Sequence, residues 1–208
     1  MPRPRGNVRE RLLAAARRRF LSDGVDGASL RKIAADAESN VGMIHYYFES
    51  KEALFLEVVE ERYATLLDDF GTILGTDGPI LARFERLSVR MGALSQEEGD
   101  VLRIVARELL TPSERRRSLL RRFERGHVAV ASKALAGAMS DGQLRNDLPL
   151  SVALMAAFAT LLLPQAIAQM LPADERPGAL RHLPPPSALA AAMRAVLERG
   201  LLGSHIES

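Results

Sequence analysis

The chain has 208 residues with nearly balanced charge, 28 basic against 26 acidic side chains, and it contains no cysteine. Disulfides, thiolate chemistry and zinc-finger sites are therefore excluded, and the four histidines are too scattered to suggest a metal site, so we expect no metal and no cofactor. No N-terminal apolar segment follows the first arginines, which predicts a cytoplasmic protein.

The charges are unevenly distributed along the chain. Residues 1–51 hold 10 basic and 6 acidic side chains, whereas the remainder holds 18 and 20. A basic N-terminal segment followed by a slightly acidic remainder is typical of a polyanion-binding module attached to another domain. A plain solvated helix surface would give the same imbalance, so the charge pattern becomes informative only together with a motif.

The first predicted elements are an arm and a helix. Residues 1–7 lack an apolar period and carry two arginines, so we interpret them either as a disordered arm that adds phosphate or minor-groove contacts, or as a solvated tail. A helix is expected from about Val8 to Ser22, and Gly24 and Gly27 are expected to end it.

The stretch over residues 29–51 predicts two short helices joined by a tight turn. Ser29 can cap the first helix, whose apolar residues recur at spacings of three and four. Asn40 can cap the second, which covers Val41–Phe48. This arrangement predicts a helix-turn-helix, whose second helix enters the DNA major groove with its N-terminal residues leading.

The second of these helices has a composition suited to DNA. Val41, Gly42 and Met43 are small or apolar and can meet base edges and thymine methyl groups, whereas the residues after them carry donors for phosphate oxygens. The predicted DNA-binding residues are Ser29, Arg31, Asn40, Val41, Gly42, Met43, His45, Tyr46, Tyr47 and Lys51.

These segments resemble the DNA-binding signature of the tetracycline-repressor (TetR) family. The resemblance rests on VRERLLAAARRRFLSDGVDGAS, SLRKIAADA and VGMIHYYFESKEALF, and it covers roughly the first fifty-five residues. It implies an all-α fold, with a three-helix DNA-binding domain over residues 1–50 and a larger helical effector-binding and dimerisation domain over residues 51–208. It also implies a homodimeric repressor that binds a palindromic operator in double-stranded DNA.

The turn departs from the family pattern, which usually has Gly, Val and Ser where this chain has Glu38, Ser39 and Asn40. Ser39 cannot form a hydrophobic staple with Ile44, and Glu38 places a negative charge near the expected DNA surface. His45 stands where the family more often has Tyr, which keeps a donor and introduces a group that can titrate near neutral pH.

Apolar spacing predicts further helices after the motif. The first runs from Lys51 to about Phe70 and is expected to act as a lever, because it starts where the recognition helix ends. A Gly-rich segment over residues 71–79 closes it, and helices follow at about 79–94, 98–110 and 113–139. The last carries arginines that suit either an acidic ligand group or a solvated face, namely Arg115, Arg116, Arg117, Arg121, Arg122 and Arg125.

Residues 148–173 form the least polar stretch and contain no charged side chain. About 20 apolar residues can span a bilayer, but three prolines and two glutamines argue against a membrane segment. A helix that is apolar all round is better explained as buried on two sides, against its own domain and a partner. The resemblance implies a homodimer that packs as a four-helix bundle through helices at about 148–172 and 187–202.

A small apolar or amphipathic molecule is the expected effector. Its cavity would lie within residues 80–170, with His127 or Gln165 as polar anchors, although residues of these types at helical spacing are more often plain core. The predicted ligand-binding residues are Phe84, Leu87, Met91, Leu102, Val105, Phe123, His127, Met155, Phe158 and Gln165.

Two other functions stay open on the sequence. One is a DNA-binding regulator or DNA-organising factor without a small-molecule pocket, controlled by a protein partner. The other is an all-helical enzyme, which is disfavoured because the sequence has no G-x-S-x-G elbow, P-loop, H-E-x-x-H motif or paired histidine.

Overall fold

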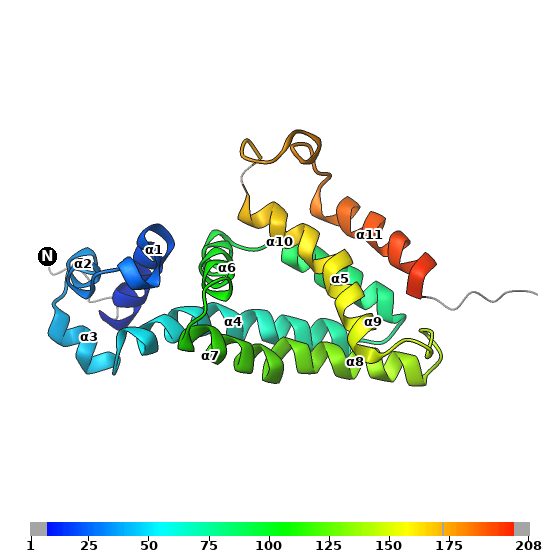
Figure 1. The fold of residues 1–208 in the computed structure, drawn as a ribbon, viewed down its shortest axis with the longest axis horizontal. Coiled ribbons are helices and arrows are strands. Elements are labelled where there is room, and N and C mark those ends of the chain that lie inside the picture. Colours follow the sequence, from blue (N-terminus) through cyan, green and yellow to red (C-terminus); the bar gives the residue numbers. More distant parts are fainter. Residues whose placement is uncertain (1–7, 172, 202–208) are drawn as a thin grey trace, which may run out of the picture. The chain divides into compact units, whose positions relative to one another are not determined.

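The computed structural model describes residues 8–171 and 173–201, and its regular structure over that part of the chain is entirely helical (Figure 1). The prediction of an all-α fold that begins with a helix-turn-helix is confirmed. In chain order the elements are α1 Val8–Gly27, α2 Leu30–Asp36, α3 Val41–Tyr47, α4 Lys51–Gly75, α5 Ile80–Gly92, α6 Gln96–Leu109, α7 Glu114–Phe123, η1 Glu124–Val128, α8 Ala129–Ser140, α9 Leu150–Ala157, η2 Phe158–Leu162, α10 Leu163–Met170, η3 Gly178–Leu180 and α11 Pro186–Leu201.

The element bounds follow the sequence signals with three differences. α1 continues to Gly27 but is kinked at Gly24, whose φ of 72° and ψ of 167° are not helical. α4 continues beyond Phe70 to Gly75, so the Gly-rich segment begins inside the helix. The helix predicted over residues 113–139 is interrupted by the π-helical turn η1 at Gly126. The predicted arm at residues 1–7 lies outside the described residues.

The described chain divides into two compact units. The first comprises the residues up to Thr65 together with Gln96–Arg121, and the second comprises Leu66–Ser95 together with the residues from Arg122 onward. α4 and α7 therefore each begin in the first unit and end in the second. The boundary expected at residue 50 falls inside the first unit, which includes α6 and most of α7.

The core of the first unit is formed where α1 to α3 meet the beginning of α4. The apolar stripe of α1 is buried, and the Phe20 ring meets the Phe55 ring of α4 edge-on, with centroids 6.0 Å apart. α2 contributes Ile33, α3 contributes Ile44, and Phe48 follows directly after α3; all three are at most 3% exposed. Burial of these residues fixes α2 and α3 against α1.

Ion pairs bind the N-terminal end of α6 to the same unit. The Arg17 guanidinium on α1, only 8% exposed, lies 2.5 Å from Glu97 at the start of α6, and Arg62 on α4 pairs with the same carboxylate. The hydrogen bond from Arg17 lowers the pKa of Glu97 below its usual value. α6 is therefore held against α1 and α4 by charge as well as by packing.

A second cluster of charges lies at the other end of α6. The Arg115 guanidinium, on α7, lies 3.0 Å from Glu108 of α6 and 2.8 Å from Asp26 near the end of α1. Burial opposes the charge of Arg115, but the surrounding carboxylates hold its pKa above the usual value. Arg115 therefore has a structural role and does not belong to a free arginine face.

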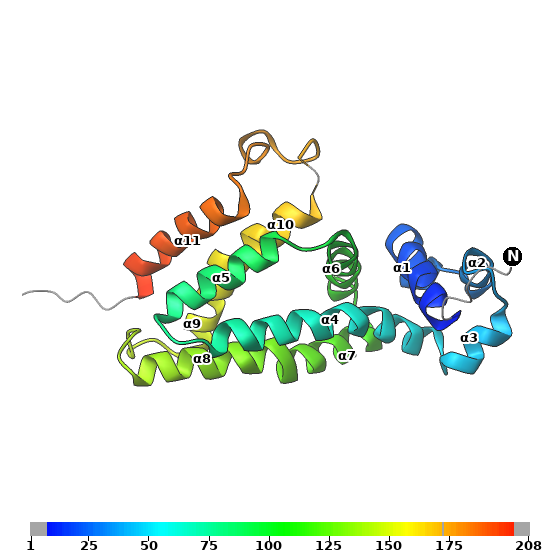
Figure 2. The same ribbon diagram turned by 180° about the vertical axis from the view of Figure 1, so that it is seen from behind.

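The second unit has its own apolar core. α4 and α5 pack there against α8, η2 and α11, and Figure 2 shows α5 beside α10 and α11. The buried core residues are Phe70, Leu74, Ile80, Leu81, Phe84, Leu87, Ala131, Leu135, Ala138, Leu144, Ala157, Leu161, Leu162 and Leu197.

Pro164 explains the π-helical turn between α9 and α10. Proline has no amide hydrogen, so Pro164 cannot donate to the Thr160 carbonyl four residues earlier, and its ring crowds that carbonyl. The helix widens in response, and the Leu163 amide donates to the carbonyl of Phe158 five residues back. Residues 150–170 therefore form one irregular helical stretch.

Leu150–Met170 is long and apolar enough to cross a bilayer, and only a third of its most apolar window is buried. Length and composition alone are weak evidence for a span, because core and interface helices of soluble proteins share both properties. The prolines at its start and within it fit a packed helix in a helical domain better than a membrane segment.

Buried polar side chains join α5, α10 and α11. The Ser88 hydroxyl donates to the Leu161 carbonyl over 2.6 Å, and the Gln165 amide donates to the Pro186 carbonyl over 2.8 Å. Gly92 lies at a close contact between these helices: a Cβ there would lie 2.5 Å from the Pro186 Cβ and would clash with the Gln165 amide.

The close approach at Gly92 gives a test of this packing. Gly92→Ala should lower the free energy of unfolding by roughly 1–3 kcal/mol, because the added methyl must displace Gln165 and Pro186. Gly137→Ala on α8 is the control: a Cβ there meets nothing within 4 Å, so it should raise stability by about 0.5–1 kcal/mol. Urea unfolding would measure both, and equal effects of the two variants would contradict the packing.

Candidate nucleic-acid interface

Ser29 occupies the N-cap position of α2 without the predicted side-chain bond. Its backbone is extended, with φ −89° and ψ 127°, and its carbonyl accepts from the Ile33 amide over 2.9 Å. The hydroxyl, however, makes no capping hydrogen bond. The prediction of the N-cap position is correct, but the prediction that the hydroxyl caps the helix is wrong, so the first turn of α2 depends on its packing.

Glu38 adopts a left-handed conformation in the turn between α2 and α3. Its φ is 50°, and among the described residues it is the one residue other than glycine with positive φ. The Glu38 amide donates to the Ala35 carbonyl over 3.0 Å and the Ser39 amide to the Ala34 carbonyl over 2.9 Å. These bonds close the C-terminal end of α2 in the way that glycine usually makes easy, at a cost of about 1–2 kcal/mol for a residue with a Cβ.

Asn40 caps α3 as predicted. Its side-chain Oδ1 accepts a hydrogen bond from the Met43 amide over 3.1 Å, and its backbone is extended. A Cβ on Gly42 would lie 3.0 Å from the same oxygen, so a larger residue there would crowd the cap. The cap fixes where the recognition helix begins.

The outer face of α3 is free for a partner. Ile44 faces the core, whereas Gly42, His45, Tyr46 and Tyr47 are exposed, and the Tyr46 side chain is 77% exposed. Val41 and Met43 are half-buried at the N-terminal end. The predicted base-facing and phosphate-facing residues thus share one accessible surface, to which α2 adds the exposed Arg31.

Lys51 differs from the other predicted DNA-binding residues. Its ammonium donates to the carbonyls of Asp26 and Ala28, each over 2.9 Å. These carbonyls lie at the C-terminal end of α1, where a cation is favourable. Lys51 therefore ties the start of α4 to the end of α1, and its charge is already engaged within the unit.

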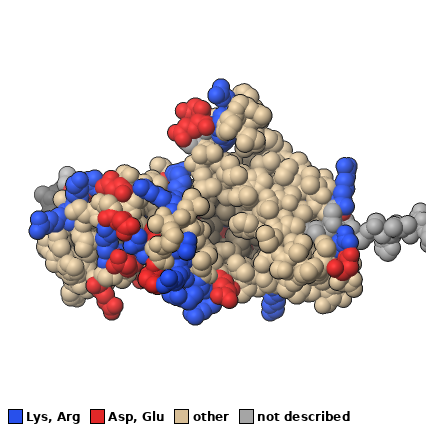
Figure 3. Space-filling model, in the orientation of Figure 1, with Lys and Arg blue, Asp and Glu red and all other residues tan. Residues whose placement is uncertain are grey.

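Several other basic residues of the first unit are also paired. Arg19 binds Asp36 over 2.6 Å, and this hydrogen bond lowers the pKa of the Asp36 carboxyl. Figure 3 shows blue and red side chains interspersed over the first unit, whereas the visible face of the second unit carries few charges. The exposed Arg31 and Lys32 remain as cations on α2.

The predicted ligand-binding residues are dispersed. Phe84 and Leu87 are buried in the core of the second unit, and Met91 packs against that core. Leu102 and Val105 lie on α6 in the first unit. Their assignment to a ligand stays a prediction.

His127 lies among aromatic rings in the second unit. Its ring is 4.9 Å from the Phe123 centroid and 5.9 Å from the Phe70 centroid. Burial lowers its pKa to about 4. The imidazole is therefore neutral at physiological pH.

Two of the predicted ligand residues lie on the surface. Met155 is 71% and Phe158 is 48% exposed, and they share the α9–η2 stretch with the exposed Val152. Leu163 on α10 and Val196 on α11 are also exposed apolar residues. The uncharged run over residues 148–173, expected from the sequence to pack against its own domain and a partner, therefore has an outward apolar face.

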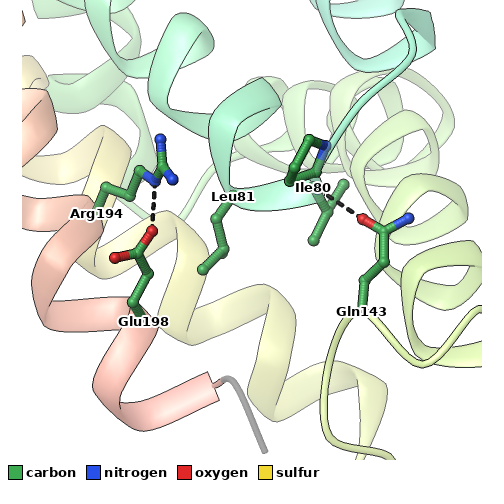
Figure 4. Close-up of a pocket in the computed structure, with 6 residues that line it drawn as sticks. Ile80, Leu81, Gln143, Arg194 and Glu198 are labelled. Carbon is green, nitrogen blue, oxygen red and sulfur yellow. Dashed lines mark hydrogen bonds and ion pairs between the residues drawn. The ribbon is translucent and has the colours of Figure 1, made fainter.

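A pocket of about 460 Å³ opens in the second unit (Figure 4). Its wall includes Ile80 and Leu81 of α5, Gln143, and the ion-paired Arg194 and Glu198 of α11. None of the predicted ligand residues lines it. Among the described residues no cluster of histidine and acidic side chains could hold a metal ion.

The chain is similar to known DNA-binding proteins. The family described as "Bacterial regulatory proteins, tetR family" matches residues 12–58. The transcriptional repressor NicS of Pseudomonas putida is 44% identical over 58 residues, which are 28% of this chain and 27% of NicS. The repressor AcnR of Corynebacterium efficiens is 27% identical over 155 residues, 70% of this chain and 73% of AcnR.

Solved structures match over most of the chain. The regulator FadR of Bacillus subtilis, solved in complex with stearoyl-CoA, superposes with a TM-score of 0.73 at 16% identity and covers 90% of this chain and 96% of FadR. At that identity the match shows the shared fold.

The position of Lys51 gives a test of its role. Lys51→Met should lower the free energy of unfolding by about 1–2 kcal/mol, because two carbonyls lose a charged donor. Lys32→Met, which removes an exposed cation from α2, should change stability by less than about 0.5 kcal/mol. If Lys51→Met leaves thermal unfolding unchanged but weakens binding to every DNA sequence, Lys51 is a phosphate contact instead.

Proposed function

Because the chain is a member of the TetR family of bacterial DNA-binding transcriptional regulators, we propose that it is a homodimeric repressor of a palindromic operator, released by a small apolar or amphipathic effector. The exposed outer face of the Asn40-capped α3 carries this proposal. Val41, Gly42 and Met43 read base edges in the major groove, and Tyr46 and Tyr47 contact phosphates.

A homodimer is supported by the apolar surface on the last helices. Val152, Met155, Phe158 and Leu163 follow one another along the α9–α10 stretch and are 39–71% exposed. Val196 on α11 is 58% exposed. These exposed apolar side chains favour an interface between two copies, because burying each one contributes about 1.5–3 kcal/mol.

Dimerisation also makes operator reading possible. A single seven-residue recognition helix reads only a few base pairs. Two copies related by a two-fold axis read an inverted repeat with half-sites about one helical turn, ~34 Å, apart. The operator of such a dimer is therefore palindromic.

The effector proposal is supported by the aromatic surroundings of His127. A neutral imidazole in contact with the Phe70 and Phe123 rings suits a molecule with an apolar body and one polar group. The FadR structure was solved with stearoyl-CoA, an amphipathic ligand of that class. A ligand that couples to DNA binding by ~1–3 kcal/mol changes operator affinity roughly 5- to 150-fold.

Selection of duplex DNA from a random pool by the purified chain tests the operator proposal. We expect recovery of an inverted repeat with half-sites about one turn apart. Recovery of no shared sequence, together with binding that disappears as salt rises, would show non-specific attraction only and would contradict an operator.

The dimer surface can be tested by one substitution. Met155→Glu should convert the dimer to a monomer and weaken binding to the inverted repeat at least 10-fold, because a charge on this surface is buried only when two copies associate. Leu110→Glu is the control, since Leu110 is 86% exposed in the first unit. Analytical ultracentrifugation would measure the mass of each variant, and a Met155→Glu chain that remains dimeric would rule out this surface.

A further inference from the structure

The turn before the recognition helix contains a strained acidic residue. Glu38 is held at a φ of 50°, where a Cβ is unfavourable, and it is exposed. Glycine or asparagine would make the same turn more easily. The residue at this position is therefore not the one that the backbone favours.

The fold gains nothing from the Glu38 side chain. Across residues 8–171 and 173–201 no hydrogen bond or ion pair engages its carboxylate, whereas the nearby Asp36 is paired with Arg19. The bonds that close the turn are made by backbone amides, which any residue supplies. A strained residue without a structural contribution points to a role outside the folded chain itself.

The position of Glu38 identifies that role. Glu38 precedes the cap residue Asn40 by two positions, so their Cα atoms are at most ~7 Å apart. The N-terminal end of the recognition helix is the end that enters the major groove, between two phosphate backbones. A carboxylate beside that end adds negative charge where the phosphates of a bound duplex would lie, and its repulsion of them decays over a Debye length of ~8 Å at physiological salt.

We propose that Glu38 is an affinity-limiting residue of the DNA interface: its carboxylate repels the phosphates beside the N-terminal end of α3 and weakens binding. This inference rests on the DNA-binding function proposed above. Repulsion of this kind opposes the phosphate attraction that dominates non-specific binding. It also keeps operator affinity in a range that an effector with a 5- to 150-fold influence can reverse.

The experiment compares substitutions that separate charge from strain. Glu38→Gln removes the charge and keeps the Cβ, Glu38→Lys reverses the charge, and Glu38→Gly removes both charge and strain. Glu124→Gln, an exposed residue of η1 in the second unit, controls for the change in net charge. Fluorescence anisotropy would measure affinity for two duplexes, the selected inverted repeat and a random sequence, over a series of salt concentrations, and thermal unfolding would verify each fold.

At ~0.15 M salt, Glu38→Gln should tighten binding to both duplexes about 3- to 10-fold, and Glu38→Lys should tighten it further. The gain should shrink as salt rises, and Glu124→Gln should bind like the unchanged chain. Should Glu38→Gln fold poorly, Glu38→Gly must still show the gain, since it relieves the turn.

Two results would overturn the inference. Unchanged affinity of Glu38→Gln would show that the carboxylate lies too far from the phosphates. Weaker binding, with the loss concentrated at one base pair, would show that Glu38 instead accepts a hydrogen bond from a base such as cytosine. If the unchanged chain itself binds neither duplex, the proposed function fails together with this inference.

Discussion

A helix of seven residues is unstable by itself in water, so the surface that we propose reads DNA depends on how α3 is held. Ile44 and Phe48 are buried in the first unit, and Asn40 supplies the acceptor that the first turn lacks. The apolar contacts stabilise α3, and the Asn40 cap defines the residue at which α3 begins. The exposed tyrosines are positioned only because both constraints hold together.

The first unit contains more of the chain than the three helices α1 to α3, because it also includes α6 and most of α7. Glu97 at one end of α6 pairs with Arg17 and Arg62, and Glu108 at the other end meets Arg115. α6 is consequently held by ion pairs at both ends, to α1 and α4 at one end and to α7 at the other. Buried charge pairs are specific in geometry, because a partner that moves away leaves an uncompensated charge behind.

The second unit shows how one apolar stretch can have two different faces. Leu161 and Leu162 are buried in the core, and Ser88 and Gln165 fix the neighbouring helices through hydrogen bonds. On the opposite face Met155 and Phe158 remain exposed. The absence of charge from residues 148–173 is thus explained by a core on one face and, as we propose, a second copy of the chain on the other.

The sequence by itself determined the features that depend on neighbouring residues. The helical periods, the Asn40 cap and the DNA-binding motif are local, because capping and amphipathic spacing act over three or four residues. It also contained the acidic turn, but not the left-handed backbone that the turn demands of Glu38.

Only the tertiary structure decided which distant groups meet. The sequence predicts Lys51 as a phosphate contact, whereas in the structure its ammonium donates to backbone carbonyls 25 and 23 residues earlier in the chain. In the sequence Arg115 is one of a run of arginines, whereas in the structure it donates to the carboxylate of Asp26, 89 residues away. By residue type Met155 resembles a core residue, whereas in the structure its side chain is exposed. Such pairings depend on how whole elements pack, and no spacing within a single element encodes them.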